Sequence, residues 1–212
     1  MRLFHDRADA GRQLSERLRE YADRDDVLVL ALPRGGVPVA CEVASRLGAP
    51  LDVFVVRKLG VPGHRELAMG AIAAGRVEVL NHDLIAALEI SPAEVAAVAE
   101  SERAELERRD RLFRGNRPAP HVAKKTIILI DDGLATGATV EAAVTALRQM
   151  SPTAVVVAVP VGARETCERL SRLADRVVCL ATPAPFDAVG LWYEDFSQTT
   201  DDEVKQLLLR VS

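Results

Sequence analysis

Two adjacent carboxylates, Asp131 and Asp132, stand between an apolar run and a run of small residues. The full segment reads Ile128-Leu129-Ile130-Asp131-Asp132-Gly133-Leu134-Ala135-Thr136-Gly137-Ala138-Thr139. A small-residue loop that opens a helix presents free backbone N–H groups and the positive end of the helix dipole, and the Thr136 and Thr139 hydroxyls add donors. Acids beside such a phosphate cradle predict a phosphorylated sugar as ligand, its hydroxyls donating to the carboxylates. The plain alternative is that the acids only cap the helix.

The sequence lacks two common phosphate-binding patterns. It contains neither G-x-x-x-x-G-K-[ST] nor G-x-G-x-x-G. A nucleoside-triphosphate P-loop and a dinucleotide fingerprint are therefore excluded.

The residues around the acid pair alternate between short apolar runs and helical patterns. The runs at residues 27–32, 51–56, 126–130, 154–159 and 177–180 read as strands, and residues 37–47, 137–150 and 164–174 read as helices. Strands that are apolar throughout, with helices between them, predict an α/β fold with a parallel sheet flanked by helices. Ligands bind such sheets at the carboxyl ends of the strands, where the acid pair lies.

The acid-pair segment resembles the phosphoribosyl-pyrophosphate (PRPP) motif of type I phosphoribosyltransferases, in which two acids precede a loop ending in Thr-Gly-x-Thr. The resemblance implies the type I fold, a parallel sheet with a small C-terminal hood, here with an inserted long helix. Two further segments fit the family in the right order. Pro33-Arg34-Gly35-Gly36, between the first strand and its helix, looks like the family's diphosphate loop, since glycine lets the backbone approach a ligand closely. Its alternative reading is a tight turn with a solvated Arg34.

Arg57 and Lys58 are expected at the end of the second strand, before a loop over residues 59–66. That stretch resembles the mobile catalytic loop that closes over PRPP. Gly60 and Gly63 would permit motion, and positive charge for the departing diphosphate would come from Arg57, Lys58, His64 and Arg65. A surface loop that happens to be basic is the alternative.

The resemblance implies an Mg²⁺-dependent glycosyltransferase that moves ribose 5-phosphate from PRPP to a nitrogenous, nucleobase-like acceptor and releases diphosphate. Asp131 and Asp132 would hold the ribose hydroxyls, and Arg57, Lys58 and His64 would complete the catalytic set. The metal would come with PRPP and reach the two acids, if at all, through water. The 5′-phosphate would bind to Gly133, Leu134, Ala135, Thr136, Gly137, Ala138 and Thr139, and the diphosphate to Arg34, Gly35, Gly36, Arg57, Lys58 and Arg65.

The acceptor is less defined by these residues. Ala135 stands where 6-oxopurine enzymes of the family typically carry Asp, which weakens a hypoxanthine or guanine assignment. The irregular stretch over residues 183–200 occupies the place of the hood, and Phe186 or Trp192 could stack on a flat acceptor. Packing in the core or at an interface is the alternative for both rings.

A long helix is expected to follow the capping sequence Ser91-Pro92-Ala93-Glu94 and to run to about residue 114, over about 34 Å. Its alternating charges indicate a solvated helix packed on one side, with a partner-binding or lid helix as the alternative. RNA binding by its arginines is a further alternative. Cys41, Cys167 and Cys179 are odd in number and widely spaced, which favours reduced core thiols over a disulfide or metal framework.

Composition sets outer bounds. The chain has 212 residues with Lys plus Arg 27, Asp plus Glu 31 and a net charge of −4, which argues against a dedicated binder of DNA or of anionic membranes. We expect one domain over residues 1–212, with a core at about 27–181, a helical insertion at 83–115 and a hood at about 183–200. The charged first ten residues argue against a signal peptide, so we expect a cytoplasmic protein. A homodimer is expected by analogy with the family.

One alternative belongs to another functional class. A regulatory protein could keep the PRPP site to sense PRPP or nucleotides without catalysis, because fold does not decide activity. The basic residues at 57, 58, 64 and 65 favour the enzyme, since a sensor would need them less.

Overall fold

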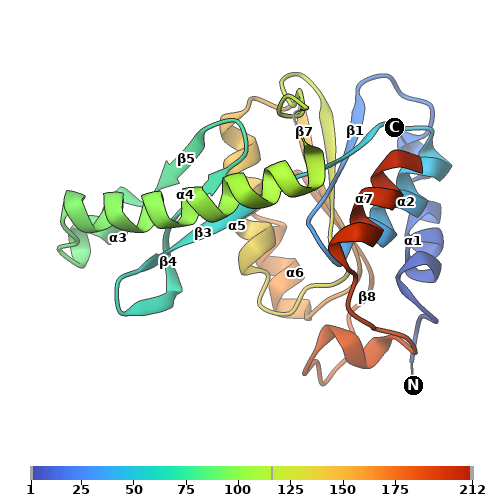
Figure 1. The fold of residues 1–212 in the computed structure, drawn as a ribbon. Coiled ribbons are helices and arrows are strands. Elements are labelled where there is room, and N and C mark those ends of the chain that lie inside the picture. Colours follow the sequence, from blue (N-terminus) through green and yellow to red (C-terminus); the bar gives the residue numbers. More distant parts are fainter. Residues whose placement is uncertain (1, 116, 211–212) are drawn as a thin grey trace.

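The computed structural model describes residues 2–115 and 117–210, apart from the side chains of residues 65 and 66. These residues form a five-stranded sheet and a smaller three-stranded sheet (Figure 1). The larger sheet is parallel throughout, in the order β2-β1-β6-β7-β8. Its strands are β1 (Val27–Ala31), β2 (Leu51–Val53), β6 (Thr126–Ile130), β7 (Ala154–Val161) and β8 (Arg176–Ala181). The expected parallel α/β core is confirmed.

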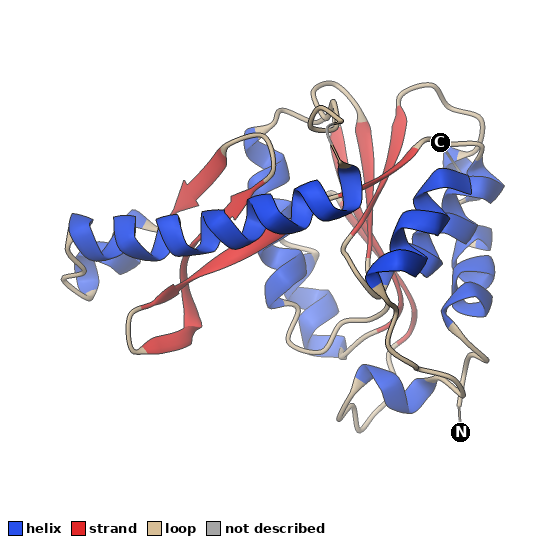
Figure 2. Cartoon of the chain, viewed as in Figure 1, coloured by secondary structure: helices blue, strands red, loops and turns tan. Residues whose placement is uncertain are grey.

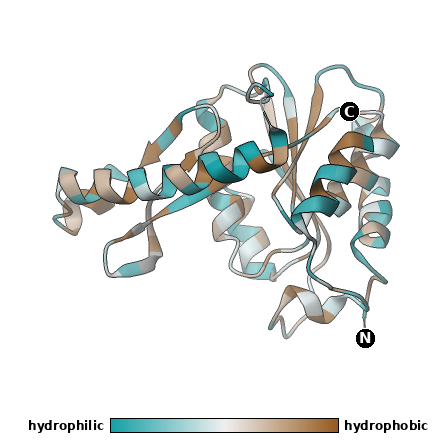
Figure 3. Cartoon of the chain, viewed as in Figure 1, coloured by the Kyte–Doolittle hydropathy of each residue, from teal (hydrophilic) through white to brown (hydrophobic). Residues whose placement is uncertain are grey.

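Helices cover both faces of the parallel sheet (Figure 2). One face packs against α1 (Arg7–Glu16), α2 (Gly36–Leu47) and α7 (Asp201–Arg210), and the other against α5 (Ala138–Gln149) and α6 (Arg164–Leu170). Alternate residues of β6 serve the two faces, Ile128 and Ile130 the first, Ile127 and Leu129 the second. Because helices cover both faces of its middle, the central strands β1, β6 and β7 are almost wholly buried and are mainly apolar, as Figure 3 shows.

The smaller sheet is antiparallel and was not predicted. It consists of β3 (Val56–Val61), β4 (His64–Ala73) and β5 (Val77–Leu80). It lies between α4 (Pro92–Arg114) and α5, with the short α3 (His82–Ala87) following β5. These strands precede the helical insertion expected at residues 83–115, so the segment between the parallel strands β2 and β6 is larger than predicted. Short 3₁₀ turns at Arg19–Tyr21 and Val189–Trp192 complete the described elements.

The expected strand over residues 51–56 is in fact two strands in different sheets. β2 ends at Val53, and β3 begins at Val56. Between them the Phe54 N–H donates to the Ala31 carbonyl at 2.9 Å in the main sheet, while the Val55 carbonyl accepts from Ala74 N–H at 3.3 Å in the small sheet. The prediction failed because nothing in an unbroken apolar run indicates the residue at which the chain leaves one sheet and enters the other.

The expected loop over residues 59–66 is instead the tip of a β-hairpin. β3 and β4 pair on either side of Pro62 and Gly63, and Gly63 has φ 77°. Proline followed by a glycine at positive φ suits a tight reverse turn, and the sequence carried this signal. Arg57 and Lys58 therefore lie within a strand rather than at its end.

The helices follow the sequence more closely. α4 has the predicted capping box, in which the Ser91 hydroxyl accepts from Glu94 N–H and the Glu94 carboxylate accepts from Ser91 N–H. α6 ends at Leu170, before the predicted residue 174. α1 was not predicted at all.

Two general expectations can be compared with this fold. Cys41, Cys167 and Cys179 are free thiols and half-buried. Within residues 2–115 and 117–210, no helix has the length and apolar character needed to span a bilayer.

Candidate active site

The acid pair lies at the carboxyl end of β6, in the middle of the parallel sheet. Asp131 and Asp132 are both half-buried, and the Asp132 N–H donates to Asp131 Oδ1 at 2.9 Å. Burial raises the pKa of both carboxyls, and the neighbouring Asp132 charge raises that of Asp131 further. Such a pair gains from hydroxyl donors or a cation, which reduce the cost of holding two charges close together.

Arg7 of α1 holds one of the two acids. Its Nε donates to Asp132 Oδ2 at 2.8 Å, and both side chains are largely buried, at 11% and 15% exposure. The guanidinium also donates to the Ser197 carbonyl at 2.7 Å and lies 3.9 Å above the Phe196 ring. Arg7 opposes the rise in the pKa of Asp132 that burial causes.

Tyr193 fixes the backbone of the same residue. Its hydroxyl donates to the Asp132 carbonyl at 2.6 Å, and its ring is buried against Phe4 with a centroid distance of 5.3 Å. Segments from both chain ends therefore pack around Asp132.

The loop from Gly133 to Thr139 opens α5, as predicted. Thr166 Oγ1 of α6 donates to the Ala135 carbonyl at 2.7 Å, and Arg169 donates to the Thr136 carbonyl. In a trans peptide the N–H of the next residue points opposite to the carbonyl. The N–H groups of Thr136 and Gly137 therefore point away from α6, and neither has an acceptor in the described part of the chain.

Not every loop residue offers a free backbone N–H group. Leu134 is 1% exposed, and its N–H already donates to the Val161 carbonyl at 2.9 Å, so it anchors the loop and offers no donor to a ligand. The Ala138 N–H faces Thr136 Oγ1 at 3.5 Å. Ala135, Thr136 and Thr139 are exposed. Gly133 lies against the hood, because a Cβ there would come within 2.5 Å of Val189 Cγ1.

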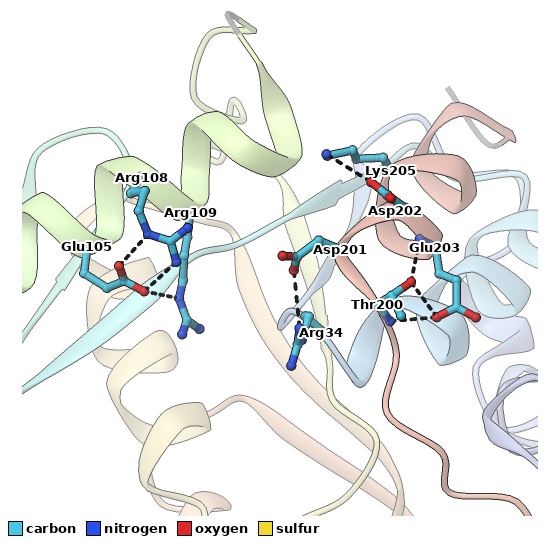
Figure 4. A network of polar contacts seen from close by, with 9 residues as sticks. All are labelled: Arg34, Glu105, Arg108, Arg109, Thr200, Asp201, Asp202, Glu203 and Lys205. Atoms are coloured by element: carbon cyan, nitrogen blue, oxygen red, sulfur yellow. Dashed lines mark hydrogen bonds and ion pairs between the residues drawn. The ribbon is translucent and has the colours of Figure 1, made fainter.

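The loop after β1 lies directly beside the acid pair. A Cβ on Gly35 would lie 2.0 Å from Asp132 Oδ2, and one on Gly36 would lie 2.6 Å from the Ile130 carbonyl oxygen. Only glycine permits this approach. The Pro33–Arg34 peptide is cis. Arg34 reaches Asp201 at the start of α7, with Nη1 to Oδ1 at 3.5 Å (Figure 4).

A cavity of about 730 Å³ joins this loop to the small sheet. Its walls come from the loop after β1, β3, the hairpin turn, α4 and the start of α5, and include Pro33, Arg57, Lys58, Glu102, Arg109 and Thr139. Arg57 is held by Glu102 of α4, with Nη2 to Oε2 at 2.6 Å. The structure thus brings Arg57 and Lys58 into one cavity with two of the predicted phosphate-binding segments.

Of the remaining predicted residues, His64 does not join this group. His64 is exposed at the first position of β4, beyond the part of the hairpin that lines the cavity. The side chain of Arg65 lies outside the described residues.

The hood carries the two predicted acceptor-binding rings. Phe186 and Trp192 are half-buried and stack on each other, with centroids 6.3 Å apart and planes inclined by 21°. The Trp192 indole N–H is buried and has no hydrogen-bond acceptor among the described residues.

With this geometry in view, comparison with known proteins identifies the family. A family model described as the phosphoribosyl transferase domain matches residues 4–193. The chain belongs to the phosphoribosyl transferase domain family. The match covers the parallel sheet, the acid pair and the start of the hood.

Individual proteins and solved structures are also similar to this chain. Protein Rv0571c of Mycobacterium tuberculosis H37Rv, provisionally named a phosphoribosyl transferase, is 50% identical over 210 residues, which are 99% of this chain and 47% of that protein. The chain thus spans about half the length of the curated relatives it matches. The crystal structure of TT1426 from Thermus thermophilus is 42% identical, covers 100% of both chains and superposes with a TM-score of 0.90. The AQ2163 protein from Aquifex aeolicus, 12% identical with a TM-score of 0.50 over 82% of this chain and 73% of its own, shares the fold alone.

Sequence reasoning missed three residues of this phosphoribosyl transferase domain site. Arg7 is 125 positions from Asp132, and Glu102 is 45 positions from Arg57. Tyr193 lies in the irregular stretch over residues 183–200, but only Phe186 and Trp192 were singled out there. No local pattern in the sequence predicts that Arg7 pairs with Asp132 or that Glu102 pairs with Arg57.

Proposed function

We propose that this phosphoribosyl transferase domain moves ribose 5-phosphate from PRPP to a nitrogenous acceptor and releases diphosphate. One observation carries the proposal: the acid pair stands between the exposed loop that opens α5 and the glycine loop after β1. A sugar held by two carboxylates would have a phosphate-binding loop on either side. PRPP, a ribose with a phosphate at one end and a diphosphate at the other, matches this order of groups.

The residues divide the ligand among them. The ribose hydroxyls would donate to Asp131 and Asp132, and the 5′-phosphate would accept from the N–H groups of Thr136 and Gly137 and from the Thr139 hydroxyl. The diphosphate would then extend past Gly35 and Gly36 toward the cavity lined by Arg57 and Lys58.

The donor set suits magnesium that arrives with the substrate. Among the described residues, no group of three or more His, Cys, Asp or Glu side chains could hold a metal by itself. Mg²⁺ commonly uses one or two carboxylates together with substrate phosphates and water. The two half-buried acids fit that pattern, directly or through water. When bound, the ion would neutralise charge on the diphosphate.

The transfer step needs electrostatic placement more than acid or base groups. The C1–O bond breaks with its electron pair going to diphosphate, and the lone pair of the acceptor nitrogen forms the C1–N bond. Any proton on that nitrogen then leaves. Lys58 and Arg57 lie where negative charge would grow on the diphosphate, and the acid pair lies near the ring that becomes positive. Closure of the β3–β4 hairpin would exclude water.

The acceptor side of the proposal rests on the hood. Phe186 and Trp192 present a stacked aromatic pair next to the acid-pair loop, which suits a flat heterocycle.

Acceptor-dependent release of diphosphate tests the proposal. The protein is incubated with PRPP, Mg²⁺ and, one at a time, purines, pyrimidines and nicotinate-type acids, with acceptor-free reactions as controls. We expect diphosphate above the acceptor-free rate for at least one nitrogen heterocycle. PRPP binding without turnover for any acceptor would support the sensor instead, and absence of PRPP binding would contradict both.

A further inference from the structure

The long helix α4 forms one wall of the cavity beside the diphosphate loop. Five lining residues come from α4: Ala97, Val98, Ser101, Glu102 and Arg109. Val95, Ala99 and Leu106 are buried and join the hydrophobic core. The helix is thus packed on one side, as its sequence predicts, while another stripe of it faces the cavity.

Two neighbouring arginines of α4, Arg108 and Arg109, differ in their exposure and in their position relative to the cavity. Arg108 and Arg109 both bind Glu105, with Nε to carboxylate oxygen distances of 2.7 Å and 2.6 Å. Arg108 is 61% exposed and Arg109 40% exposed. In the described part of the chain, Arg109 lines the cavity and Arg108 does not. Figure 4 shows that the Arg108 and Arg109 side chains reach Glu105 from different sides and that Arg109 extends below the helix.

The charges in the cavity are arranged for an anion. Arg57, Lys58 and Arg109 line it together with one acid, Glu102, which Arg57 binds. Arg57 and Arg109 each pair with a glutamate of α4, and both of these partners are partly exposed, so an incoming anion of higher charge can replace them. Arginine matches phosphate oxygens through its planar set of donors.

We propose that α4 forms the outer wall of the diphosphate pocket and that Arg109 binds the diphosphate there. The inference rests on the proposed function, since it names the residue that the inserted helix adds to that site. It gives the insertion a direct part in ligand binding and distinguishes Arg109 from the rest of the basic face of α4.

Calorimetric titration with inorganic diphosphate in a magnesium-containing buffer tests this assignment. The variants are Arg109→Ala and, as a matched control, Arg108→Ala, which removes the same charge and a bond to the same Glu105. We expect Arg109→Ala to weaken diphosphate binding by about tenfold or more, because it removes a hydrogen bond between charged groups. Arg108→Ala should change it by less than about twofold. Arg109→Lys, which keeps the charge but not the fork of donors, should fall between them.

A second ligand separates local from general effects. Ribose 5-phosphate should bind to Arg109→Ala as it binds to the unaltered protein, because the acid pair and the loop that opens α5 are intact. Equal diphosphate affinity in the Arg108 and Arg109 variants, with PRPP still bound by the unaltered protein, would overturn the role of Arg109 and leave the proposed function standing. Failure of the unaltered protein to bind either PRPP or diphosphate would overturn both.

Discussion

Asp131 and Asp132 keep two adjacent carboxyls half-buried at the end of a hydrophobic strand, which opposes folding. The hydrogen bond from Asp132 N–H to Asp131 and the ion pair from Arg7 to Asp132 offset part of this cost. The cost of burying the two charges that is not offset raises the pKa of both carboxyls. Strain of this kind is typical of sites that are built for a ligand rather than for stability.

Asp131→Asn is expected to stabilise the protein at neutral and alkaline pH. A carboxyl whose pKa is higher in the folded than in the unfolded chain binds its proton more tightly when folded. Its ionised form therefore weakens folding as the pH rises above the ordinary value of 3.8 toward the raised pKa. Asn removes the charge and keeps an acceptor for Asp132 N–H, so we expect a gain of about 1–2 kcal/mol at pH 8.

Thermal unfolding at several pH values measures this effect. The gain should shrink as the pH is lowered and vanish below about pH 3, where the Asp131 carboxyl is protonated in both the folded and the unfolded chain. Asp25→Asn, at an exposed position, serves as the control and should show no such trend. A gain that is independent of pH, or a loss at pH 8, would contradict the explanation.

Single site residues could be proposed from the sequence where several residues with suitable chemistry lie next to one another in the chain. Asp131, Asp132, Thr136 and Thr139 could be proposed as site residues because acids and hydroxyls follow a hydrophobic run within twelve residues. Arg7 could not be predicted as a site residue, because its role depends on its ion pair with Asp132. Only folding brings the two side chains within 2.8 Å. The sequence motif also could not show that the Leu134 N–H is already bonded to the Val161 carbonyl, because that bond forms only when β7 packs beside the loop.

At the scale of elements, the site depends on two neighbouring parallel strands that end together. β1 and β6 pair in register up to Ala31 and Ile130, so the loops that follow them start side by side. The Leu32 N–H continues the pairing by donating to the Ile130 carbonyl at 2.9 Å. Gly35 and Gly36 then permit the first loop to cross directly over the acid pair.

Gly36→Ala is expected to destabilise the protein by about 1–3 kcal/mol, because its Cβ would meet the backbone at Ile130 and Asp131, which cannot yield cheaply. Gly35→Ala is the matched comparison. Its Cβ would meet the carboxylate of Asp132, which can rotate, so the loss of stability should be smaller and the loss of PRPP affinity larger. Chemical denaturation measures the first quantity and calorimetry the second. Equal stability of Gly36→Ala and the unaltered protein would contradict the close approach.

Helices and strands could be predicted where a short stretch of sequence shows an apolar run or a helix-capping motif. The strands of the parallel sheet and the start of α4 followed from apolar runs and from Ser91-Pro92-Ala93-Glu94. The small sheet was missed because β4 contains few β-branched residues and gains its stability from pairing with β3 and β5. The C-terminal end of α6 lies four residues before the predicted end at residue 174, because local signals alone do not fix where a helix ends.

The whole molecule places its site where three bodies meet: the parallel sheet, the inserted small sheet with α4, and the segments from the two chain ends. Residues 4–193 carry the family match, and α7 lies beyond it yet supplies Asp201 to Arg34. The relatives of about twice this length show that the domain also occurs within longer proteins. The homodimer that the family resemblance implies stays a prediction.

Binding of PRPP to the unaltered protein and to the variant carrying both Asp131→Asn and Asp132→Asn tests the central claim most directly. Calorimetry in magnesium-containing buffer, with circular dichroism to verify the fold, gives the two affinities. The account predicts that the unaltered protein binds PRPP and that the double variant, although folded, binds it at least about a hundredfold more weakly, since two charge-assisted contacts to the ribose are lost. Equal affinity of the two proteins for PRPP would contradict it.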